Sequence, residues 1–387
     1  MRILFYMWDA VTEADAAEYM RQLGISVITL SKKIQSYNED DELRKIVDEI
    51  CRTNNFEYIF SFNYFPLLSK IAMEKGIGYI AWVYDSPHIT LNSKTIINDC
   101  NFIFHFDYYE YSRMKKMGIT NVFYLPMAVN ADRLSRQEKK YGKGYCHDVS
   151  FIGNMYSGQE DLWTQIQYLP EGLKGYLEGG MKVQSQLFGY DVLDQLINEK
   201  VWKEIEKYVS LKMSEEYFSD ERQQFVEGIL RRHITATERK SILNAVSEIA
   251  PTVIYSSRKT PELLRIKNMG WADYETKMPE VFKRSKINLN ITLRSIHSGI
   301  PLRVMDIMGA GGFALSNFQL EMQNFFRIGE ELESFSNTEE CLEKVSFYLK
   351  HETARERIAV RGCQKVRNEF NYAVQLRQLF RMMSIEL

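Results

Sequence analysis

Arg303 and Asp306 are the pair of residues whose types and spacing best suit ligand chemistry. They lie in Ser298-Gly-Ile-Pro-Leu-Arg-Val-Met-Asp-Ile-Met-Gly-Ala-Gly-Gly312, whose apolar residues predict a short, buried helix. Residues three positions apart share one face of a helix. A guanidinium suits a phosphate and a carboxylate suits hydroxyl groups, so the pair predicts a polar ligand. The alternative is a simple exposed ion pair, worth about 0.3 kcal/mol.

The turn in front of this helix predicts an anion site. Residues 286–292 alternate in the manner of a strand, and the turn after them contains Arg294, His297 and Ser298. The first turn of a helix presents unpaired N–H groups and the positive end of the helix dipole, which together attract anions. We therefore expect a diphosphate at the start of the helix and a diol-like group held by Asp306.

Composition excludes several classes of protein. With 387 residues the chain exceeds one hydrophobic core, which predicts two domains. A net charge of −2 argues against a nucleic-acid partner held through its phosphates. Five scattered cysteines indicate reduced thiols. Because we find neither an export signal nor an apolar run of the ~20 residues that span a bilayer, we expect a soluble, cytoplasmic protein of undefined oligomeric state.

Strands and helices alternate along the chain, and the strands are continuously apolar, which predicts α/β architecture with parallel sheets covered on both faces. We expect a first doubly wound domain over residues 1–130, a polar and basic linker over 131–147, and a second doubly wound domain over 148–370. Within the second domain, the pattern predicts a helical insertion over residues 161–249. Residues 371–387 carry one apolar helical stripe that must be buried to be stable.

Ligand-binding side chains are expected in the loops after the strands, because open parallel sheets bind ligands beyond the carboxyl ends of their strands. In the first domain these loops contain aromatic and polar residues, namely Trp8, Asp9, Asn63, Tyr64, Asp85 and His88. In the second domain they contain glycine, polar and basic residues, namely Gly153, Asn154, Arg258, Arg294, His297 and Ser298. The two sets predict a cleft for a hydroxyl-rich group on one side and a nucleoside diphosphate on the other.

Several known signatures are missing from the sequence. The first strand is followed by Met7-Trp-Asp-Ala-Val-Thr12 and not by G-x-G-x-x-G, so the dinucleotide-binding fingerprint is absent. The chain also has no Walker A sequence, no H-E-x-x-H and no Asp-x-Asp pair. We therefore expect no metal site, and no cofactor other than a nucleotide-diphosphate sugar used as a substrate.

Five segments resemble the spore-maturation-protein (CgeB-like) branch of the GT-B glycosyltransferases, and together they span most of the chain outside the insertion. They are Trp82-Val-Tyr-Asp-Ser-Pro87, Leu125-Pro-Met-Ala-Val-Asn130, Ser150-Phe-Ile-Gly-Asn154, Lys286-Ile-Asn-Leu-Asn-Ile-Thr292 and Leu302-Arg-Val-Met-Asp-Ile-Met-Gly-Ala-Gly-Gly312. The resemblance implies a GT-B fold, with two Rossmann-like domains facing across a cleft. In the wider superfamily a glutamate at the place of Asp306 holds the ribose hydroxyls. A second acidic residue usually lies where this chain has Ser298.

The resemblance also implies an activity: transfer of a sugar from a nucleotide-diphosphate sugar, with a UDP-sugar favoured, to a hydroxyl of a glycan or glycoprotein of the bacterial cell surface. The second domain would hold the donor and the first the acceptor. Asp85, or His88 beside it, is the candidate general base, and a turn cap is the alternative for Asp85. The last helix would cross back onto the first domain. Two other functions stay open: a sugar-nucleotide epimerase, and a non-catalytic glycan-binding or scaffold protein.

Overall fold

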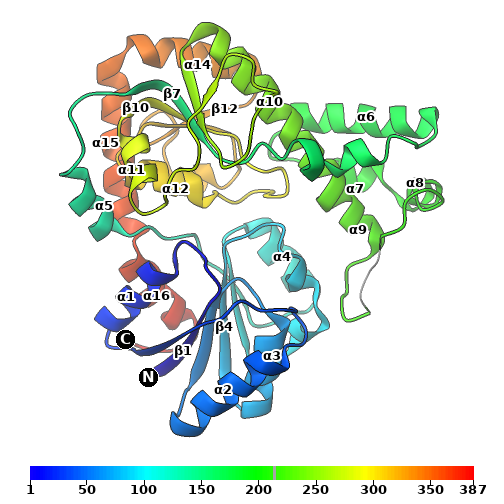
Figure 1. Cartoon of the computed structure of the whole chain (residues 1–387), viewed down its shortest axis with the longest axis vertical. Helices are drawn as coiled ribbons and strands as arrows, with labels where there is room; N and C mark the ends of the chain where they lie inside the picture. Colours follow the sequence, from blue (N-terminus) through cyan, green and yellow to red (C-terminus); the bar gives the residue numbers. More distant parts are fainter. Residues whose placement is uncertain (212–214) are drawn as a thin grey trace. The chain divides into compact units, whose positions relative to one another are not determined.

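The computed structural model describes residues 1–211 and 215–387, which form two compact units (Figure 1). Unit 1 combines Met1–Ala128 and Glu369–Leu387 with a short segment that ends at Ser219. Unit 2 begins at Val129 and includes Asp220–Asn368. Each unit is built on a parallel sheet of six strands with helices on its faces. The predicted α/β class with two doubly wound sheets is therefore confirmed.

Unit 1 has the strand order β2-β1-β3-β4-β5-β6. The strands are β1 (Arg2–Met7), β2 (Ser26–Ser31), β3 (Tyr58–Phe62), β4 (Gly78–Val83), β5 (Asn101–His105) and β6 (Val122–Tyr124). The helices are α1 (Glu13–Gln22), α2 (Asp41–Thr53), α3 (Pro66–Lys75), α4 (Tyr108–Lys116) and α16 (Tyr372–Met382), with 3-10 turns at Ile89–Asn92 and Lys94–Ile97. The order changes direction between β1 and β3, so the loops after these two strands border the crevice of this sheet.

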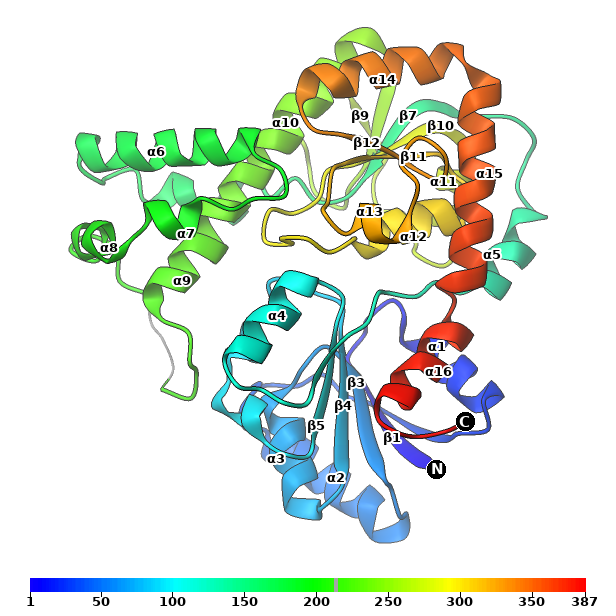
Figure 2. The same cartoon turned by 180° about the vertical axis from the view of Figure 1, so that it is seen from behind.

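The last helix of the chain, α16, completes the core of unit 1. Helices α2, α3 and α4 cover one face of the sheet, and α1 and α16 cover the other (Figures 1 and 2). The apolar stripe of α16 faces inward, because Leu376, Leu379 and Phe380 are fully buried. Tyr372, in the first turn of α16, lies with its ring centroid 6.1 Å from that of Trp82 in β4.

Unit 2 has the strand order β12-β11-β10-β7-β8-β9. The strands are β7 (His147–Ile152), β8 (Thr252–Tyr255), β9 (Lys267–Asn268), β10 (Ser285–Asn290), β11 (Ala314–Asn317) and β12 (Glu333–Phe335). The helices outside the insertion are α5 (Ala131–Glu138), α11 (Lys277–Lys283), α12 (Leu302–Gly309), α13 (Met322–Phe325), α14 (Thr338–Lys350) and α15 (Glu352–Glu369). Helix α5 thus occupies part of the expected linker. Across residues 1–211 and 215–387, we find no helix that combines the length and the apolar character of a membrane span.

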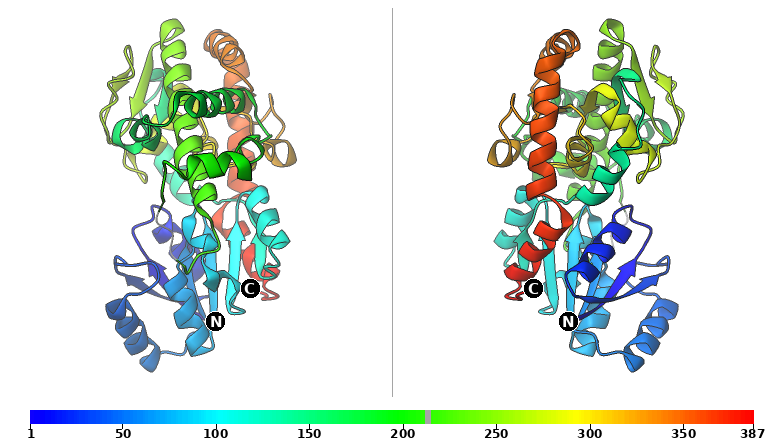
Figure 3. Two further views of the ribbon diagram at one scale, coloured as in Figure 1. Left: turned by 90° about the vertical axis from the view of Figure 1, so that its right-hand side faces the viewer. Right: turned by 90° about the vertical axis from the view of Figure 1, so that its left-hand side faces the viewer.

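The insertion lies between β7 and β8 and is mostly helical. It contains α6 (Glu171–Gln186), α7 (Leu193–Leu196), α8 (Glu199–Ile205), α9 (Glu221–Phe225) and α10 (Arg232–Ile249). A π-helical segment, Val226–Arg231, joins α9 to α10. The insertion has a hydrophobic core of its own, and it lies on the side of the unit 2 sheet opposite α15 (Figure 3).

Candidate active site

In unit 2 the strand order changes direction between β7 and β10, so the loops after these strands border the crevice of the sheet. Arg239 of α10 ties the two loops together. Its Nε and Nη2 donate to the carbonyl oxygen of Ile291, at 3.0 and 2.6 Å, and its Nη1 donates to the carbonyl oxygen of Asn154. The first carbonyl follows β10 and the second follows β7. One buried guanidinium therefore fixes both sides of this crevice.

The same guanidinium makes the crevice electropositive. Burial lowers the pKa of Arg239, because water no longer solvates the charge, and repulsion from Arg303 lowers it further. The ring of Tyr156 lies 5.1 Å from the guanidinium carbon of Arg239, which places the cation over an aromatic face. Two arginines that repel each other at one sheet edge favour the binding of an anion between them.

Arg303 and Asp306 share one face of α12, as their spacing predicts. Nη1 of Arg303 lies 3.4 Å from Oδ2 of Asp306, whose residue is 8% exposed. The phenol of Tyr274 donates to the other carboxylate oxygen, Oδ1, at 3.0 Å. The guanidinium also lies 5.7 Å from the ring of Phe282 and contacts the sulfur of Met278. Both side chains are therefore held in place before any ligand binds.

The start of α12 is open to an anion. Pro301 is the residue before the helix, and no side chain of the described residues caps the helix N-terminus. Backbone N–H groups in the first turn of a helix, together with its dipole, attract a phosphate. A diphosphate at this point and a ribose at Asp306 would place the charges and hydroxyls of a nucleotide against groups that match them.

Arg294 has a different environment from the one predicted. Its Nε donates to both carboxylate oxygens of Glu238, at 3.0 and 2.9 Å. Nη1 donates to the carbonyl of Leu187 at 2.7 Å, and Nη2 to the carbonyl of Ser185 at 3.0 Å. The guanidinium is thus occupied by α10 and by residues of α6 and the loop after it. In this geometry Arg294 holds the turn before α12 and does not point at a phosphate.

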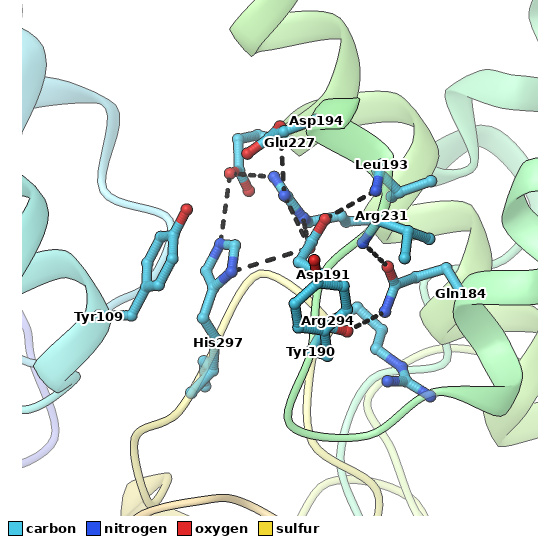
Figure 4. A network of polar contacts seen from close by, with 12 residues as sticks. Tyr109, Gln184, Tyr190, Asp191, Leu193, Asp194, Glu227, Arg231, Arg294 and His297 are labelled. Atoms are coloured by element: carbon cyan, nitrogen blue, oxygen red, sulfur yellow. Dashed lines mark hydrogen bonds and ion pairs between the residues drawn. The ribbon is translucent and has the colours of Figure 1, made fainter. Parts of the chain in front are cut away.

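His297 is also directed toward the insertion. Its Nδ1 lies 3.8 Å from Oδ2 of Asp191, and its Nε2 lies 3.7 Å from Oε1 of Glu227 (Figure 4). Arg231, which is 1% exposed, pairs with both carboxylates and lies 2.8 Å from that of Asp191. The imidazole therefore belongs to a charged network that anchors the turn to the insertion.

Ser298 holds the carboxylate of Glu321 beside the turn before α12. Its hydroxyl donates to Oε1 of Glu321 at 2.6 Å, and the backbone N–H of Glu321 donates to the carbonyl of Ser298 at 3.1 Å. Glu321 is 3% exposed and precedes α13. A buried acidic group thus lies beside the position where the wider superfamily carries its second acidic residue.

The loops after β7 and β8 hold the remaining predicted donor residues. A Cβ at Gly153 would lie 3.2 Å from the ring of Phe151, so the close approach of this ring favours glycine. The amide of Asn154 donates to Glu160 at 2.8 Å, and Arg258 pairs with the same carboxylate at 2.6 Å. The Arg258 side chain, in the loop after β8, is 59% exposed, so this is a surface ion pair.

In unit 1 the structure brings Asn63 and Asp85 together. The amide of Asn63 donates to Oδ2 of Asp85 at 2.6 Å, and its carbonyl oxygen accepts the backbone N–H groups of Tyr84 and Asp85. Asn63 adopts a φ of 61°, which a short amide side chain tolerates. Asp85, the candidate general base, is exposed. Its orientation is nevertheless fixed by Asn63.

Tyr64 lies in the core, and His88 is half-buried against its backbone. Tyr64 is fully buried and its hydroxyl bonds to Thr95 at 2.8 Å, so its predicted place on the cleft surface is wrong. The Nε2 atom of His88 lies 3.2 Å from the backbone nitrogen of Tyr64 and 3.0 Å from its carbonyl oxygen. Burial lowers the pKa of His88, which favours the neutral ring. The sequence placed both residues after strands but did not show how deeply they are packed.

The loop between β1 and α1 contains Trp8 and Asp9 and is held by a residue that the sequence reading missed. The indole of Trp8 donates to the carbonyl of Phe62 at 2.8 Å, and Asp9 adopts a φ of 76°. Glu13, which is 2% exposed, accepts the backbone N–H of Trp8 at 2.7 Å. Burial raises the pKa of Glu13 to about 7, partly opposed by hydrogen bonds from the loop backbone. In the sequence, Glu13 could have been noticed as an acidic residue at the start of the first helix.

Comparisons with known proteins agree with this geometry. Residues 222–381, which include α12, match the family model described as glycosyl transferase-like. This part of the chain is therefore similar to the glycosyl transferases of that family. None of the curated proteins matches the sequence.

Solved structures with similar folds include three proteins that align along nearly the whole chain. Sucrose-phosphate synthase from Thermosynechococcus elongatus has 7% identity over 99% of each chain, with a TM-score of 0.60. A glycosyltransferase from Rickettsia africae has 10% identity over 98% of this chain and 97% of its own, with a TM-score of 0.56. Anabaena HepE, solved with UDP and glucose, has 9% identity over 99% of each chain, with a TM-score of 0.51. The chain has the GT-B fold. The match of residues 222–381 to the glycosyl transferase-like model supports a transferase.

Proposed function

We propose that the protein transfers a sugar from a nucleotide-diphosphate sugar to a hydroxyl of a glycan or glycoprotein, without a metal ion. The observation that carries this proposal is the placement of Arg303 and Asp306 on α12, at the carboxyl edge of the unit 2 sheet. A UDP-sugar is favoured as the donor because HepE was solved with UDP and glucose. The five segments that resemble CgeB-like enzymes support a place in that branch, in the cytoplasm, with a cell-surface glycan as product.

The chemistry that follows from this placement is electrostatic. As the bond between sugar and diphosphate breaks, negative charge develops on the leaving phosphate oxygens. Arg303 and the start of α12 would stabilise that charge, and the positive charge of Arg239 would add to the effect. Asp306, held by Tyr274, would accept the ribose hydroxyls. On the acceptor side, Asp85 would take the proton of the attacking hydroxyl if the reaction inverts configuration.

Calorimetric titration with UDP tests the donor site. Arg303→Ala should weaken UDP binding by about 1.5–3 kcal/mol, the range for hydrogen bonds to charged groups. Asp306→Asn should weaken UDP binding while leaving the melting temperature unchanged. Arg327→Ala, at a side chain that is 78% exposed, is the matched control and should bind UDP like the parent. If both site variants also bind UDP like the parent, the donor site lies elsewhere.

Release of UDP from UDP-glucose, with and without a glycan acceptor, tests the reaction itself. A transferase releases UDP in step with acceptor modification, whereas conversion to another UDP-sugar without release would indicate an epimerase. No group of three or more His, Cys, Asp or Glu side chains among the described residues is arranged to hold a metal ion. We expect turnover to persist in EDTA. Loss of turnover that Mg²⁺ or Mn²⁺ restores would contradict the metal-independent reaction.

A further inference from the structure

A cavity of about 270 Å³ lies inside the helical insertion, away from the residues discussed as the donor site. Its walls come from the turn Leu162–Gln165, from α6 and from the first two turns of α10. Its lining includes apolar, hydroxyl-bearing and imidazole side chains, namely Trp163, Met181, Ser185, His233, Ile234 and Thr237. Two charged and exposed residues, Glu178 and Lys182, also line it. The three apolar residues are at least nine-tenths buried and form fixed walls.

His233 supplies the cavity with a polar group of defined orientation. Its Nδ1 lies 2.8 Å from Oδ2 of Asp161, so the Nδ1–H donates to that carboxylate, and in the neutral ring Nε2 is an acceptor. Asp161 is itself fixed, because its other oxygen accepts the backbone N–H of Trp163 at 3.2 Å. Within the described chain no hydrogen bond reaches Nε2 of His233, and the side chain is 25% exposed.

The backbone before His233 has an unusual geometry that sets its direction. The π-helical segment Val226–Arg231 ends two residues earlier, and such segments are rare and often lie at functional sites. One wider turn rotates every later residue of the helix about its axis. His233, Ile234 and Thr237, which follow this segment on α10, all line the cavity.

We propose that this cavity binds a small phenol-type molecule, with one apolar ring and one hydroxyl group. An apolar cavity of about 150 Å³ holds a benzene ring, so the volume here accommodates a substituted ring. The ring would pack against Trp163, Met181 and Ile234. The hydroxyl would donate its proton to Nε2 of His233, which no other hydrogen bond reaches in the described chain.

Arg294 connects this cavity to the turn before α12. Ser185 lines the cavity, and its carbonyl accepts from Nη2 of Arg294 at 3.0 Å. The backbone N–H of Arg294 donates at 3.0 Å to Thr235, which lies between two cavity residues on α10. A ligand that changes the spacing of α6 and α10 therefore moves both anchors of Arg294. We accordingly expect the ligand to alter nucleotide affinity, an expectation that rests on the donor site proposed above.

Calorimetry with phenol and anisole tests the binding itself. Anisole has a similar shape but no hydroxyl proton to donate. In the parent, phenol should bind about fivefold more tightly than anisole, as expected for one hydrogen bond. His233→Phe should abolish this preference, whereas His351→Phe, at an exposed histidine at the C-terminal end of α14, should retain it. Equal affinity for the two compounds in the parent, or no heat with either, would overturn the proposal.

A second variant, Thr237→Leu, tests the proposal even if His233→Phe does not fold. Thr237 is exposed at the mouth of the cavity, so Thr237→Leu should leave the melting temperature unchanged. The added bulk should weaken phenol and anisole alike. If a folded Thr237→Leu variant binds both compounds like the parent, they bind at another place and the proposal is wrong.

The connection to the turn is tested by titrating UDP with and without saturating phenol. In the parent we expect the UDP dissociation constant to change about fivefold, the lower end of known couplings between sites. Arg294→Lys should retain phenol binding and lose this change. If UDP binds but phenol has no effect on it, the connection is disproved. If UDP does not bind although the phenol preference is present, the proposed transferase site fails and the cavity remains.

Discussion

The phenol of Tyr274 donates a hydrogen bond of 3.0 Å to Oδ1 of Asp306, while Arg303 approaches Oδ2 at 3.4 Å. Each oxygen of the carboxylate thus has its own neighbour, which fixes the plane of the group. The guanidinium of Arg133 lies 5.3 Å from the ring of Tyr274 and holds that ring in turn. A carboxylate with a fixed plane can accept two adjacent ribose hydroxyls at little cost in conformational entropy.

Tyr274→Phe should weaken UDP binding by about three- to tenfold, the equivalent of one neutral hydrogen bond. The substitution keeps the ring and its contact with Arg133, so stability should change little. Calorimetry with UDP measures the effect. Tyr176→Phe, which removes a hydroxyl bonded to a carbonyl on the insertion surface, is the matched control. Unchanged affinity in Tyr274→Phe would show that Asp306 needs no fixed orientation.

Arg294→Met should destabilise unit 2 by about 3–5 kcal/mol, because it leaves Glu238 buried without its cation. Burial already raises the pKa of Glu238, and Arg294 opposes that effect. Urea unfolding measures the loss. The double variant Arg294→Met with Glu238→Leu should recover most of it, since no uncompensated charge is then buried. A double variant as unstable as the single one would mean that Arg294 acts through its contacts with Ser185 and Leu187.

Glu13→Gln should change how stability depends on pH. In the folded protein the pKa of Glu13 is raised from 4.5 to about 7, so the folded state binds this proton more tightly than the unfolded state. The stabilisation is complete below pH 4.5 and is lost as the pH rises through 7. The loss amounts to at most about 3 kcal/mol. Denaturation at several pH values should show a smaller decline in Glu13→Gln. An identical decline in parent and variant would assign it to other groups.

Asp85→Asn should lower kcat by about 10²–10⁴ while UDP affinity stays the same, as expected for the loss of a general base. The amide keeps the shape of the side chain and can still meet Asn63. Steady-state kinetics, once an acceptor is known, measure the effect. Asp41→Asn, at an exposed residue of the first turn of α2, is the control. A near-normal kcat would make Asp85 a turn residue.

Much of the fold could be predicted because its signals are local. Continuous apolar strands alternating with helices predict the two sheets, and the stripe of α16 follows from its helical spacing. The glycines after α12 also indicate their role: Gly311 adopts a φ of 77°, and a Cβ at Gly312 would lie 2.6 Å from the carbonyl oxygen of Phe282. Arg303 and Asp306 share a face for the same reason, since three residues nearly complete one helical turn.

The rest of the site depends on contacts between distant residues. Arg239 lies 85 positions from Asn154 and 52 from Ile291, so nothing local indicates that it joins their two loops. The sequence around Arg294 predicts a phosphate ligand, but in the structure Arg294 pairs with Glu238 of the insertion. The sequence likewise predicts that Tyr64 lines the cleft, but its hydroxyl bonds to Thr95 in the core. In each case a residue type suits two roles, and long-range packing decides between them.

The position of α16 also has a consequence for how the polypeptide is made. The sheet face lined by Phe60, Trp82 and Phe104 is covered in part by a helix that follows all of unit 2 in the chain. Translation proceeds at about 5–20 residues per second, so this aromatic surface stays exposed for on the order of tens of seconds before α16 is synthesised. We expect the nascent chain to be held by a chaperone during that interval. The first part of the polypeptide to leave the ribosome is therefore the last to become a finished domain.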